Sequence, residues 1–235
     1  MCTRFVLLQE HLREMLQRLG LGEDVEFASR YNIAPMTRVP AVRAKPKREK
    51  ASLRWGLVPS WAKEDVGFKM VNARAETLAE KPAFRDAFQK RRCVIPASGY
   101  YEWQTVGSAK LPWFFQMHDK RPFLFAGLWE TWHGTTGAPL ETCSIITTTS
   151  NELASTIHNR MPVVLGTAAA EAWLDPDETE SARLTPLLQI LPAGKMTARR
   201  VWRFVSNVRN EGPDCLAPAS EDNAGEAPQL SLGFE

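Results

Sequence analysis

Cys2 carries the most specific chemistry in this sequence, because removal of Met1 would leave a free amine and a thiol on neighbouring carbons. Methionine is usually trimmed when the next side chain is as small as cysteine. The α-amine has an ordinary pKa of about 7.7–8.0 and the thiol one of about 8.5, so both are partly nucleophilic near neutral pH. Such a 1,2-aminothiol condenses with an aldehyde to an imine, which the thiolate closes to a thiazolidine ring. On its position alone, Cys2 is more simply explained as the residue that follows the start of translation.

Polar residues that could serve such chemistry occur in short clusters between apolar segments. Taken singly, Asn72 and Arg74 could lie in a turn, Glu102 on a half-exposed strand, and His158 beside a helix C-terminus, where a positive charge is favoured. No cluster matches a phosphate-binding loop, a dinucleotide fingerprint, a GxSxG elbow or an HExxH motif. The clusters are RYNIAP (30–35), RWGLVPSW (54–61), VNARAET (71–77), PASGYYEW (96–103), IHNRMPV (157–163) and SNVRNEGPDC (206–215).

Apolar periodicity predicts the helices that position these clusters. A helix over 8–19 would place Leu8, Leu12, Met15, Leu16 and Leu19 on one face. Other helices are expected at 78–90, at 150–157 behind a capping box of Thr149 and Glu152, and from a Thr167 cap through Trp173.

Segments rich in aromatic and β-branched residues predict strands through the middle of the chain. A basic, proline-broken stretch at 43–54 is expected to be an exposed loop that leads into them. Because strands and helices alternate without a βαβ rhythm, the sequence predicts an α+β fold around a curved, largely antiparallel sheet. The expected strands are 53–58, 93–95, 112–117, 123–129, 142–148 and 199–205.

The composition of the 235 residues is that of an ordinary folded domain. No apolar run is long enough for a membrane span and the start does not resemble a signal peptide, so a cytoplasmic protein is expected. The four cysteines form no CxxC or Cys/His cluster, which argues against a metal site, a disulfide framework or a bound cofactor.

Charge is distributed unevenly along the chain. Residues 211–235 contain six acidic residues and no Lys or Arg, which leaves 29 basic against 21 acidic residues, a net charge of +8, in 1–210. A basic folded part suits a polyanionic partner, although a solvated surface balanced by an acidic tail explains the charge as well. We expect one domain over 1–217 and a disordered acidic tail over 218–235.

Together with Cys2 and Arg4 of the opening MCTRF, the clusters resemble the SRAP (SOS-response-associated peptidase) family of abasic-site processing proteins. The resemblance runs from Met1 to about Cys215, with the motifs in the family's order and at similar spacing. It implies a single α+β domain with a barrel-like sheet and flanking helices. It also implies a monomer that needs no cofactor and cross-links covalently to abasic sites in single-stranded DNA, in the cytoplasm and at the nucleoid when bound.

The same resemblance assigns roles to individual residues. Cys2 would be the nucleophile, Asn72 would orient its amine and the opened sugar, Glu102 would be a general acid/base, and His158 a second acid/base. The positions expected to grip the DNA backbone are Arg4, Arg74 and Arg160. Those expected to shape the nucleotide groove are Asn32, Pro35, Trp61 and Trp103. Thr3 departs from the family's usual glycine.

An abasic sugar reacts through its open aldehyde, and fast thiazolidine closure would shield the strand from β-elimination, with lyase activity and reversal as side reactions. Two alternatives stay open. A thiol autopeptidase could use Cys2, Asn72 and Glu102 to remove Met1 itself. A non-covalent single-strand or RNA-binding module would leave Cys2 incidental.

Overall fold

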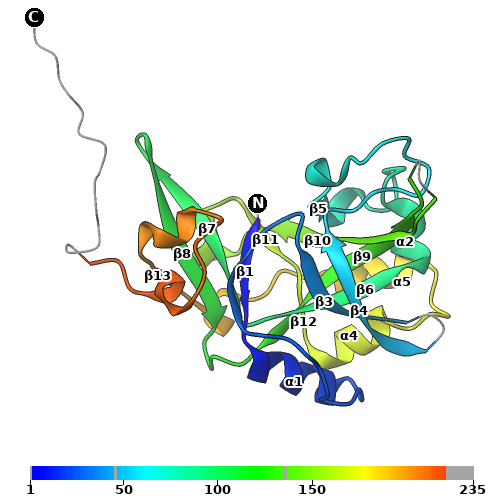
Figure 1. Ribbon diagram of the computed structural model, residues 1–235, viewed down its shortest axis with the longest axis horizontal. Helices are drawn as coiled ribbons and strands as arrows, with labels where there is room; N and C mark the ends of the chain where they lie inside the picture. The colour runs from blue at the N-terminus through cyan, green and yellow to red at the C-terminus, as the bar shows by residue number, and fades with distance from the viewer. Residues whose placement is uncertain (1, 45–46, 135–136, 221–235) are drawn as a thin grey trace, which may run out of the picture.

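The computed structural model describes residues 2–44, 47–134 and 137–220, and two β-sheets dominate it (Figure 1). This arrangement confirms the expected α+β class and the largely antiparallel, barrel-like core. Five strands of the larger sheet close into a barrel, in the order β10-β4-β3-β6-β9 with β9 pairing back to β10. Only the β10–β4 pair in this ring is parallel. The ring strands are β3 Arg38–Ala44, β4 Arg48–Trp55, β6 Arg92–Ala97, β9 Phe123–Trp132 and β10 Leu140–Thr149.

Three short strands extend the barrel near its rim. β5 runs parallel to β10, β11 runs antiparallel to β10, and β12 runs antiparallel to β9. Both β5 and β11 therefore place candidate residues beside the same long strand. Their bounds are β5 Asn72–Arg74, β11 Arg160–Pro162 and β12 Val164–Leu165.

The second sheet is antiparallel throughout, in the order β13-β8-β7-β1-β2. Its face toward the barrel contributes Phe5, Tyr100 and Phe115 to the main core, and its other face packs under the C-terminal segment 201–216. Figure 1 shows β1 at the junction of the two sheets. The strands are β1 Arg4–Leu7, β2 Arg30–Ile33, β7 Gly99–Val106, β8 Ala109–Met117 and β13 Met196–Arg200.

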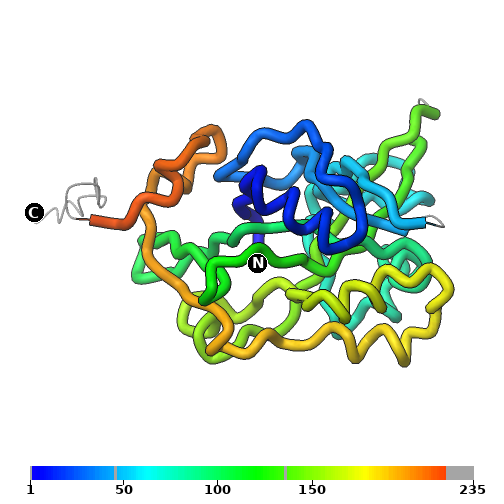
Figure 2. Tube along the Cα trace, turned by 90° about the horizontal axis from the view of Figure 1, so that it is seen from below, coloured from blue at the N-terminus to red at the C-terminus, as the bar shows by residue number. Residues whose placement is uncertain are grey.

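Short helices surround the sheets, and α1 lies across the end of β1 that is remote from Cys2 (Figures 1 and 2). Leu12, Met15 and Leu16 of α1 are buried, as the predicted apolar face requires. No helix in the described part of the chain is long and apolar enough to cross a membrane. The helices are α1 Gln9–Arg18, α2 Arg85–Lys90, α3 Glu152–Ser155, α4 Thr167–Trp173 and α5 Ser181–Leu184. The 3-10 segments are η1 Gly67–Lys69, η2 Ala75–Thr77, η3 Thr185–Leu187, η4 Ala193–Lys195, η5 Arg203–Ser206 and η6 Pro213–Leu216.

The prediction of a loop at 43–54 is wrong, because β3 and β4 pair as an antiparallel hairpin from Arg38↔Arg54 to Ala44↔Arg48. Several of its charged residues lie on the solvated face of the hairpin, and Arg43 turns inward to pair with Glu49 and Glu141 at 2.7 Å. The strand predicted over 53–58 stops at Trp55, since Gly56 takes a left-handed φ of 133°.

Other element boundaries also differ from the prediction. The helix expected over 78–90 is reduced to α2, because Pro82 cannot donate the backbone hydrogen bond that a longer helix needs. Asn151, rather than Thr149, caps α3 by accepting from the Ala154 N–H at 2.9 Å, and Gly166 precedes α4 as its cap. The late strand lies at 196–200 instead of 199–205. The predicted tail lies outside the described residues from 221 onward, and Pro218 forms a β-bridge with Val201.

Gly99 is a packing constraint in the second sheet. A Cβ at this position would lie 2.2 Å from the Phe114 ring and 2.6 Å from the Phe115 carbonyl oxygen. We expect Gly99→Ala to lower the free energy of unfolding by about 1–3 kcal/mol through overpacking, measured by urea denaturation. Gly194→Ala is the matched control, because a Cβ there meets no atom within 4 Å. Equal effects of the two substitutions would contradict this assignment.

Candidate active site

Cys2 lies two residues before β1 and is completely buried. The backbone is held in place on one side by β1, which pairs with β7 through Arg4↔Tyr101 and Phe5↔Tyr100. Burial raises the pKa of the Cys2 thiol well above its ordinary value, and the nearby negative charge of Glu102 raises it further. The thiol is therefore protonated at neutral pH and needs a base before it can attack. Met1, and with it the question of its removal, lies outside the described residues.

Asn72 contacts Cys2 directly. Its side-chain amide donates to the Cys2 carbonyl oxygen at 2.8 Å, and the first residue of β5 is fixed by parallel pairing with Ile145 of β10. The other amide atom of Asn72, Oδ1, is buried and accepts no hydrogen bond from the described residues. A buried amide oxygen without a donor can receive an N–H from the Cys2 amine or a hydroxyl from a ligand.

Glu102 is the acidic group of the site. It lies on β7, is only 4% exposed, and shares a strand face with Tyr100. Burial raises the pKa of Glu102 from 4.5 to about 7. A carboxyl group with this pKa can donate or accept a proton near neutrality, as general acid/base catalysis requires.

His158 follows α3 and is half-buried. Its pKa is lowered, first by burial and then by the nearby positive charges of Lys110 and Arg160. The ring is therefore neutral at pH 7. The backbone N–H of Arg160 donates to Nδ1 at 3.0 Å, which assigns the remaining ring hydrogen to Nε2. His158 Nε2 is thus an N–H donor rather than an acceptor.

The loop that carries His158 is tied to the strand that carries Glu102. The Gln104 side chain on β7 donates to the Thr156 carbonyl oxygen at 2.9 Å and accepts from the Trp113 indole at 3.2 Å. Gln104 was not among the predicted residues, although it belongs to the same strand as Glu102. Its position two residues after Glu102 was the only available sequence signal.

Tyr100 is a second residue that the sequence analysis missed. Its hydroxyl is buried and has no hydrogen-bond partner among residues 2–44, 47–134 and 137–220. Burial raises its pKa well above the ordinary value, and Cys2 and Glu102 contribute to the same shift. The alternation of the GYYEW motif places Tyr100 on the Glu102 side of β7, which is the signal that could have identified it.

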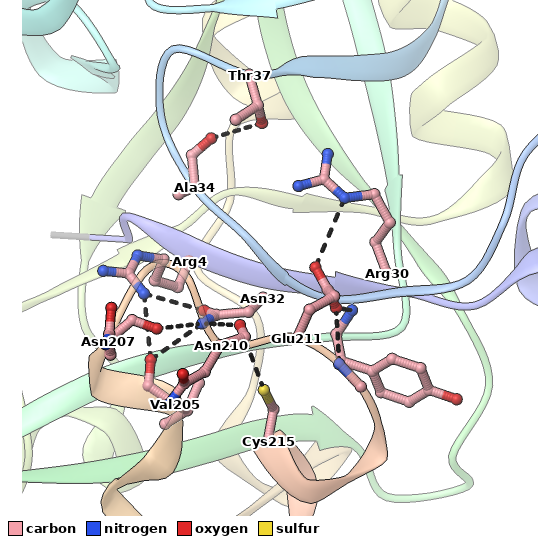
Figure 3. A network of polar contacts seen from close by, with 12 residues as sticks. Arg4, Arg30, Asn32, Ala34, Thr37, Val205, Asn207, Asn210, Glu211 and Cys215 are labelled. Atoms are coloured by element: carbon pink, nitrogen blue, oxygen red, sulfur yellow. Dashed lines mark hydrogen bonds and ion pairs between the residues drawn. The ribbon is translucent and has the colours of Figure 1, made fainter.

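Arg4 and Asn32 form the centre of a polar network rather than an open groove (Figure 3). Arg4 donates to the Asn32 side-chain oxygen at 2.9 Å and to the Val205 carbonyl at 3.2 Å. The Asn32 amide donates to the carbonyl oxygens of Val205, Asn207 and Asn210 at 3.2, 3.0 and 2.8 Å. Asn32 therefore fastens the C-terminal segment 205–210 onto β1 and β2.

The three predicted backbone-gripping arginines lie in different environments. Arg74 is exposed at the end of β5, and its side chain makes no hydrogen bond or ion pair with the described residues. Arg160 is half-buried and forms a bidentate pair with Glu76 at 2.6 and 2.9 Å, and it also donates to the Thr147 carbonyl. Only Arg74 is thus ready to meet a phosphate without first releasing a protein partner.

The predicted groove residues are also distributed unevenly. Trp103 lies against Arg4, whose guanidinium is 5.6 Å from the ring centroid, and its indole N–H donates to Ser206 at 3.1 Å. Pro35 is half-buried in the turn between β2 and β3. Trp61 is 63% exposed and forms no ring or polar contact with the other candidates among the described residues. An exposed indole of this kind is available for stacking on a base.

The described residues contain no group of three or more His, Cys, Asp or Glu side chains that could hold a metal ion, and the thiols of Cys2, Cys93, Cys143 and Cys215 are free and buried. The site brings a thiol, an amide, a carboxyl group and an imidazole to one end of the β1–β7 pair. These groups suit covalent and acid/base chemistry on a carbonyl compound.

The network around Asn32 predicts a local loss of order. We expect Asn32→Ala to cost about 2–3 kcal/mol, because it removes the amide whose two N–H groups serve three carbonyl oxygens, together with the acceptor of Arg4. Hydrogen exchange should accelerate mainly in residues 203–216. Asn159→Ala, at an exposed asparagine, is the control. An equal acceleration throughout the molecule would refute the assignment of Asn32 as the fastener of this segment.

The raised pKa of Glu102 predicts a pH-dependent stability. Between pH 4.5 and about 7 the folded state binds more protons than the unfolded state. The contribution of Glu102 to the free energy of unfolding therefore falls as pH rises through that window. Glu102→Gln, which mimics the protonated form, should stabilise the fold by about 1–3 kcal/mol at pH 8 and have little effect at pH 4.5. Denaturant titrations at both pH values measure the difference. A stabilisation that does not change with pH would show that the carboxyl is not buried in its charged form.

Known proteins are similar in sequence to this chain over most of its length. Residues 1–208 match the family described as SOS response associated peptidase (SRAP). The chain is 39% identical over 222 residues to the abasic site processing protein YoqW of Bacillus subtilis (strain 168), covering 92% of this chain and 99% of that protein. It is 35% identical to the abasic site processing protein HMCES of Gallus gallus, covering 80% of this chain and 66% of that one.

Solved structures show the same architecture. A crystal structure of a protein from Bacteroides thetaiotaomicron is 31% identical and superimposes with a TM-score of 0.74, covering 80% of this chain and 85% of that one. A phage-related protein from Bordetella bronchiseptica is 26% identical, with a TM-score of 0.69 over 85% and 94% of the two chains. From the extent of the sequence match, the shared fold and the relatives it resembles, the chain belongs to the SOS response associated peptidase (SRAP) family.

Proposed function

We propose that this protein binds abasic sites in single-stranded DNA and links to them covalently through the amine and thiol of Cys2, once Met1 has been removed. The observation that carries the proposal is the position of Cys2, whose carbonyl is held by Asn72 at 2.8 Å while Glu102 lies close enough to raise the pKa of its thiol. The abasic site processing names of the relatives support the lesion as substrate.

The groups present allow a balanced route to a thiazolidine. The Cys2 amine adds to the aldehyde carbon of the opened sugar, and protonated Glu102 gives a proton to the hydroxyl that leaves as water. The carboxylate so formed can take the proton of the Cys2 thiol as sulfur attacks the imine carbon, and the imine nitrogen ends protonated as the ring amine. A pKa of about 7 suits Glu102 to both transfers.

Asn72 and His158 would orient the reactants. The buried Oδ1 of Asn72 can accept a hydrogen from the amine and leave its lone pair directed at the aldehyde. The Nε2–H of neutral His158 can donate to a sugar or phosphate oxygen. A donor at the sugar oxygen would assist ring opening, and the reverse proton transfers would govern reversal and strand cleavage.

The DNA contacts proposed here involve backbone and stacking rather than base edges. Exposed Arg74 would neutralise a phosphate, and the indoles of Trp61 and Trp103 offer surfaces for flanking bases. Arg160 would contribute after exchange of its Glu76 partner for phosphate. Single-stranded DNA fits such a surface because no side chain needs to reach a paired base.

The covalent proposal makes a direct prediction. Mature protein with Cys2 at its N-terminus should shift a single-stranded abasic oligonucleotide on a denaturing gel without borohydride, whereas Cys2→Ala should give no stable adduct because sulfur closes the ring. Cys93→Ala is the matched control, since that thiol is equally buried in the barrel. Intact-mass analysis reports both the loss of Met1 and the mass of the adduct.

Three outcomes separate the proposal from its alternatives. Cross-linking by a verified Met1-retaining sample would remove the amine from the mechanism. Undiminished DNA binding by Cys2→Ala, with no adduct from the mature wild type, would indicate a non-covalent module. Cleavage of a peptide substrate added in trans, without an adduct, would indicate a peptidase.

The proposed backbone contact of Arg74 predicts a change in salt dependence. Arg74→Ala should reduce the log–log salt slope of single-strand binding by about 0.7, with similar weakening for all sequences. Arg13→Ala is a matched control, because Arg13 is also exposed and without a described ion pair, but lies on α1 at the far end of β1. Equal slopes for wild type and Arg74→Ala would remove Arg74 from the DNA contact.

A further inference from the structure

A cavity of about 290 Å³, lined by both apolar and polar residues, lies on the face of strands β1, β7, β8 and β13 that looks away from the barrel. Leu8 and His11 line it, so it lies at the α1 end of β1, whereas Cys2 precedes the other end of that strand. Six residues separate Cys2 from Leu8, which amounts to about 20 Å along a strand. None of the residues assigned to the abasic-site chemistry lines this cavity.

The strand register builds the floor of the cavity. Gly99 pairs with Val6 of β1, and its missing side chain leaves room for the Phe114 ring, which a Cβ would meet at 2.2 Å. Phe114, Val6 and Leu216 thus form an apolar base of fixed shape. This floor can support an apolar or aromatic part of a ligand.

One wall supplies an oriented hydrogen-bond donor. The Ser98 hydroxyl accepts from the Leu8 backbone N–H at 2.9 Å and lies 2.8 Å from Nδ1 of His11. We assign Ser98 as the donor to Nδ1, because its oxygen already accepts from the Leu8 N–H. With this tautomer the His11 ring carries a hydrogen on Nε2, away from Ser98.

The opposite wall supplies two cations without counter-charges. Arg199 lies opposite Phe114 in the β13–β8 pair, with its guanidinium 5.4 Å from the ring centroid. Its Nη1 is buried and has no hydrogen-bond partner among the described residues. Lys120 is held at a left-handed φ of 59° by a turn in which its backbone N–H donates to the Met117 carbonyl oxygen. Neither the Arg199 nor the Lys120 side chain forms an ion pair within the described ranges.

Buried guanidinium nitrogens are normally hydrogen-bonded, and adjacent cations without an acidic partner repel each other. No Asp or Glu is among the described residues that line the cavity, while Gln116 adds a further polar group. Arg and Lys, together with neutral donors, are the usual ligands of phosphate. The cavity therefore combines the donors of an oxyanion-binding site with an apolar base.

We propose that this cavity binds a phosphate group attached to an apolar or aromatic body, with Arg199 and Lys120 as its charged ligands. The Arg199 guanidinium would donate to one phosphate oxygen and His11 Nε2 to another, while the attached body lies against Leu8 and Leu216, the half-buried apolar residues that line the cavity. The phosphate belongs either to a free nucleotide or to a DNA end. The site is separate from Cys2 and does not depend on cross-linking.

Calorimetric titration of the full chain with inorganic phosphate and with thymidine 5′-monophosphate tests the proposal. We expect saturable binding of both, tighter for the nucleotide, and a loss of at least about tenfold in affinity for Arg199→Gln and for Lys120→Gln, as one charge-assisted hydrogen bond contributes. Arg200→Gln is the matched control. Arg200 is the next residue of β13, is exposed and does not line the cavity, so its substitution removes the same charge outside the site. Its affinity should stay within about twofold of the wild type.

Two oligonucleotides without an abasic site, one with a 5′-phosphate and one with a 5′-hydroxyl, distinguish a DNA end from a free nucleotide as the origin of the bound phosphate. Arg199-dependent preference for the phosphorylated strand identifies a DNA end as ligand, and its absence alongside nucleotide binding identifies a free nucleotide. No saturable binding of phosphate, nucleotide or phosphorylated strand up to about 10 mM would overturn the proposal. An equal loss in Arg200→Gln would also overturn it, by reducing the effect to overall charge. Arg199→Gln should still cross-link abasic DNA at the wild-type rate, so failure here is distinguishable from failure of the Cys2 proposal.

Discussion

Phe5 packs edge-on against Trp55 and Phe125, with ring centroids 5.4 and 5.7 Å apart, and this contact joins the open sheet to the barrel. Because aromatic rings in a close-packed core have little freedom, β1 cannot slide or rotate. Cys2 lies only three residues before Phe5 and inherits this rigidity. In the proposed reaction the folded core already holds Cys2 in place, which reduces the cost of ordering it before it reacts.

The same burial determines the electrostatics of the site. It raises the pKa of the Cys2 thiol and of Glu102, so at pH 7 the thiol is protonated and Glu102 is about half protonated, whereas a solvated glutamate would be ionised. A buried carboxyl with a pKa of about 7 lowers the free energy of unfolding above that pH. Groups whose pKa is shifted in this way concentrate at functional sites. Elsewhere in the second sheet, Asn32 contributes order by fastening the segment 205–210 against β1 and β2.

Where sequence patterns failed, tertiary contacts decided the outcome. The hairpin of β3 and β4 was predicted as a loop because its many charges and its proline indicate exposure, yet Arg43 is buried and neutralised by two glutamates from different parts of the chain. Asn151 replaced Thr149 as the cap of α3, since which of two neighbouring side chains reaches the free N–H depends on where the chain enters the helix.

The sequence by itself determined the family and its α+β fold, since the order and spacing of the polar clusters, read with Cys2 and Arg4, identified both before any contact was known. Only the tertiary structure decided what each group is able to do. The pKa of Glu102, the hydrogen on His158 Nε2 and the pairing of Arg160 with Glu76 all depend on burial and on partners distant in sequence. Solvation and long-range contacts are properties of the folded chain, and no local pattern of residue types encodes them.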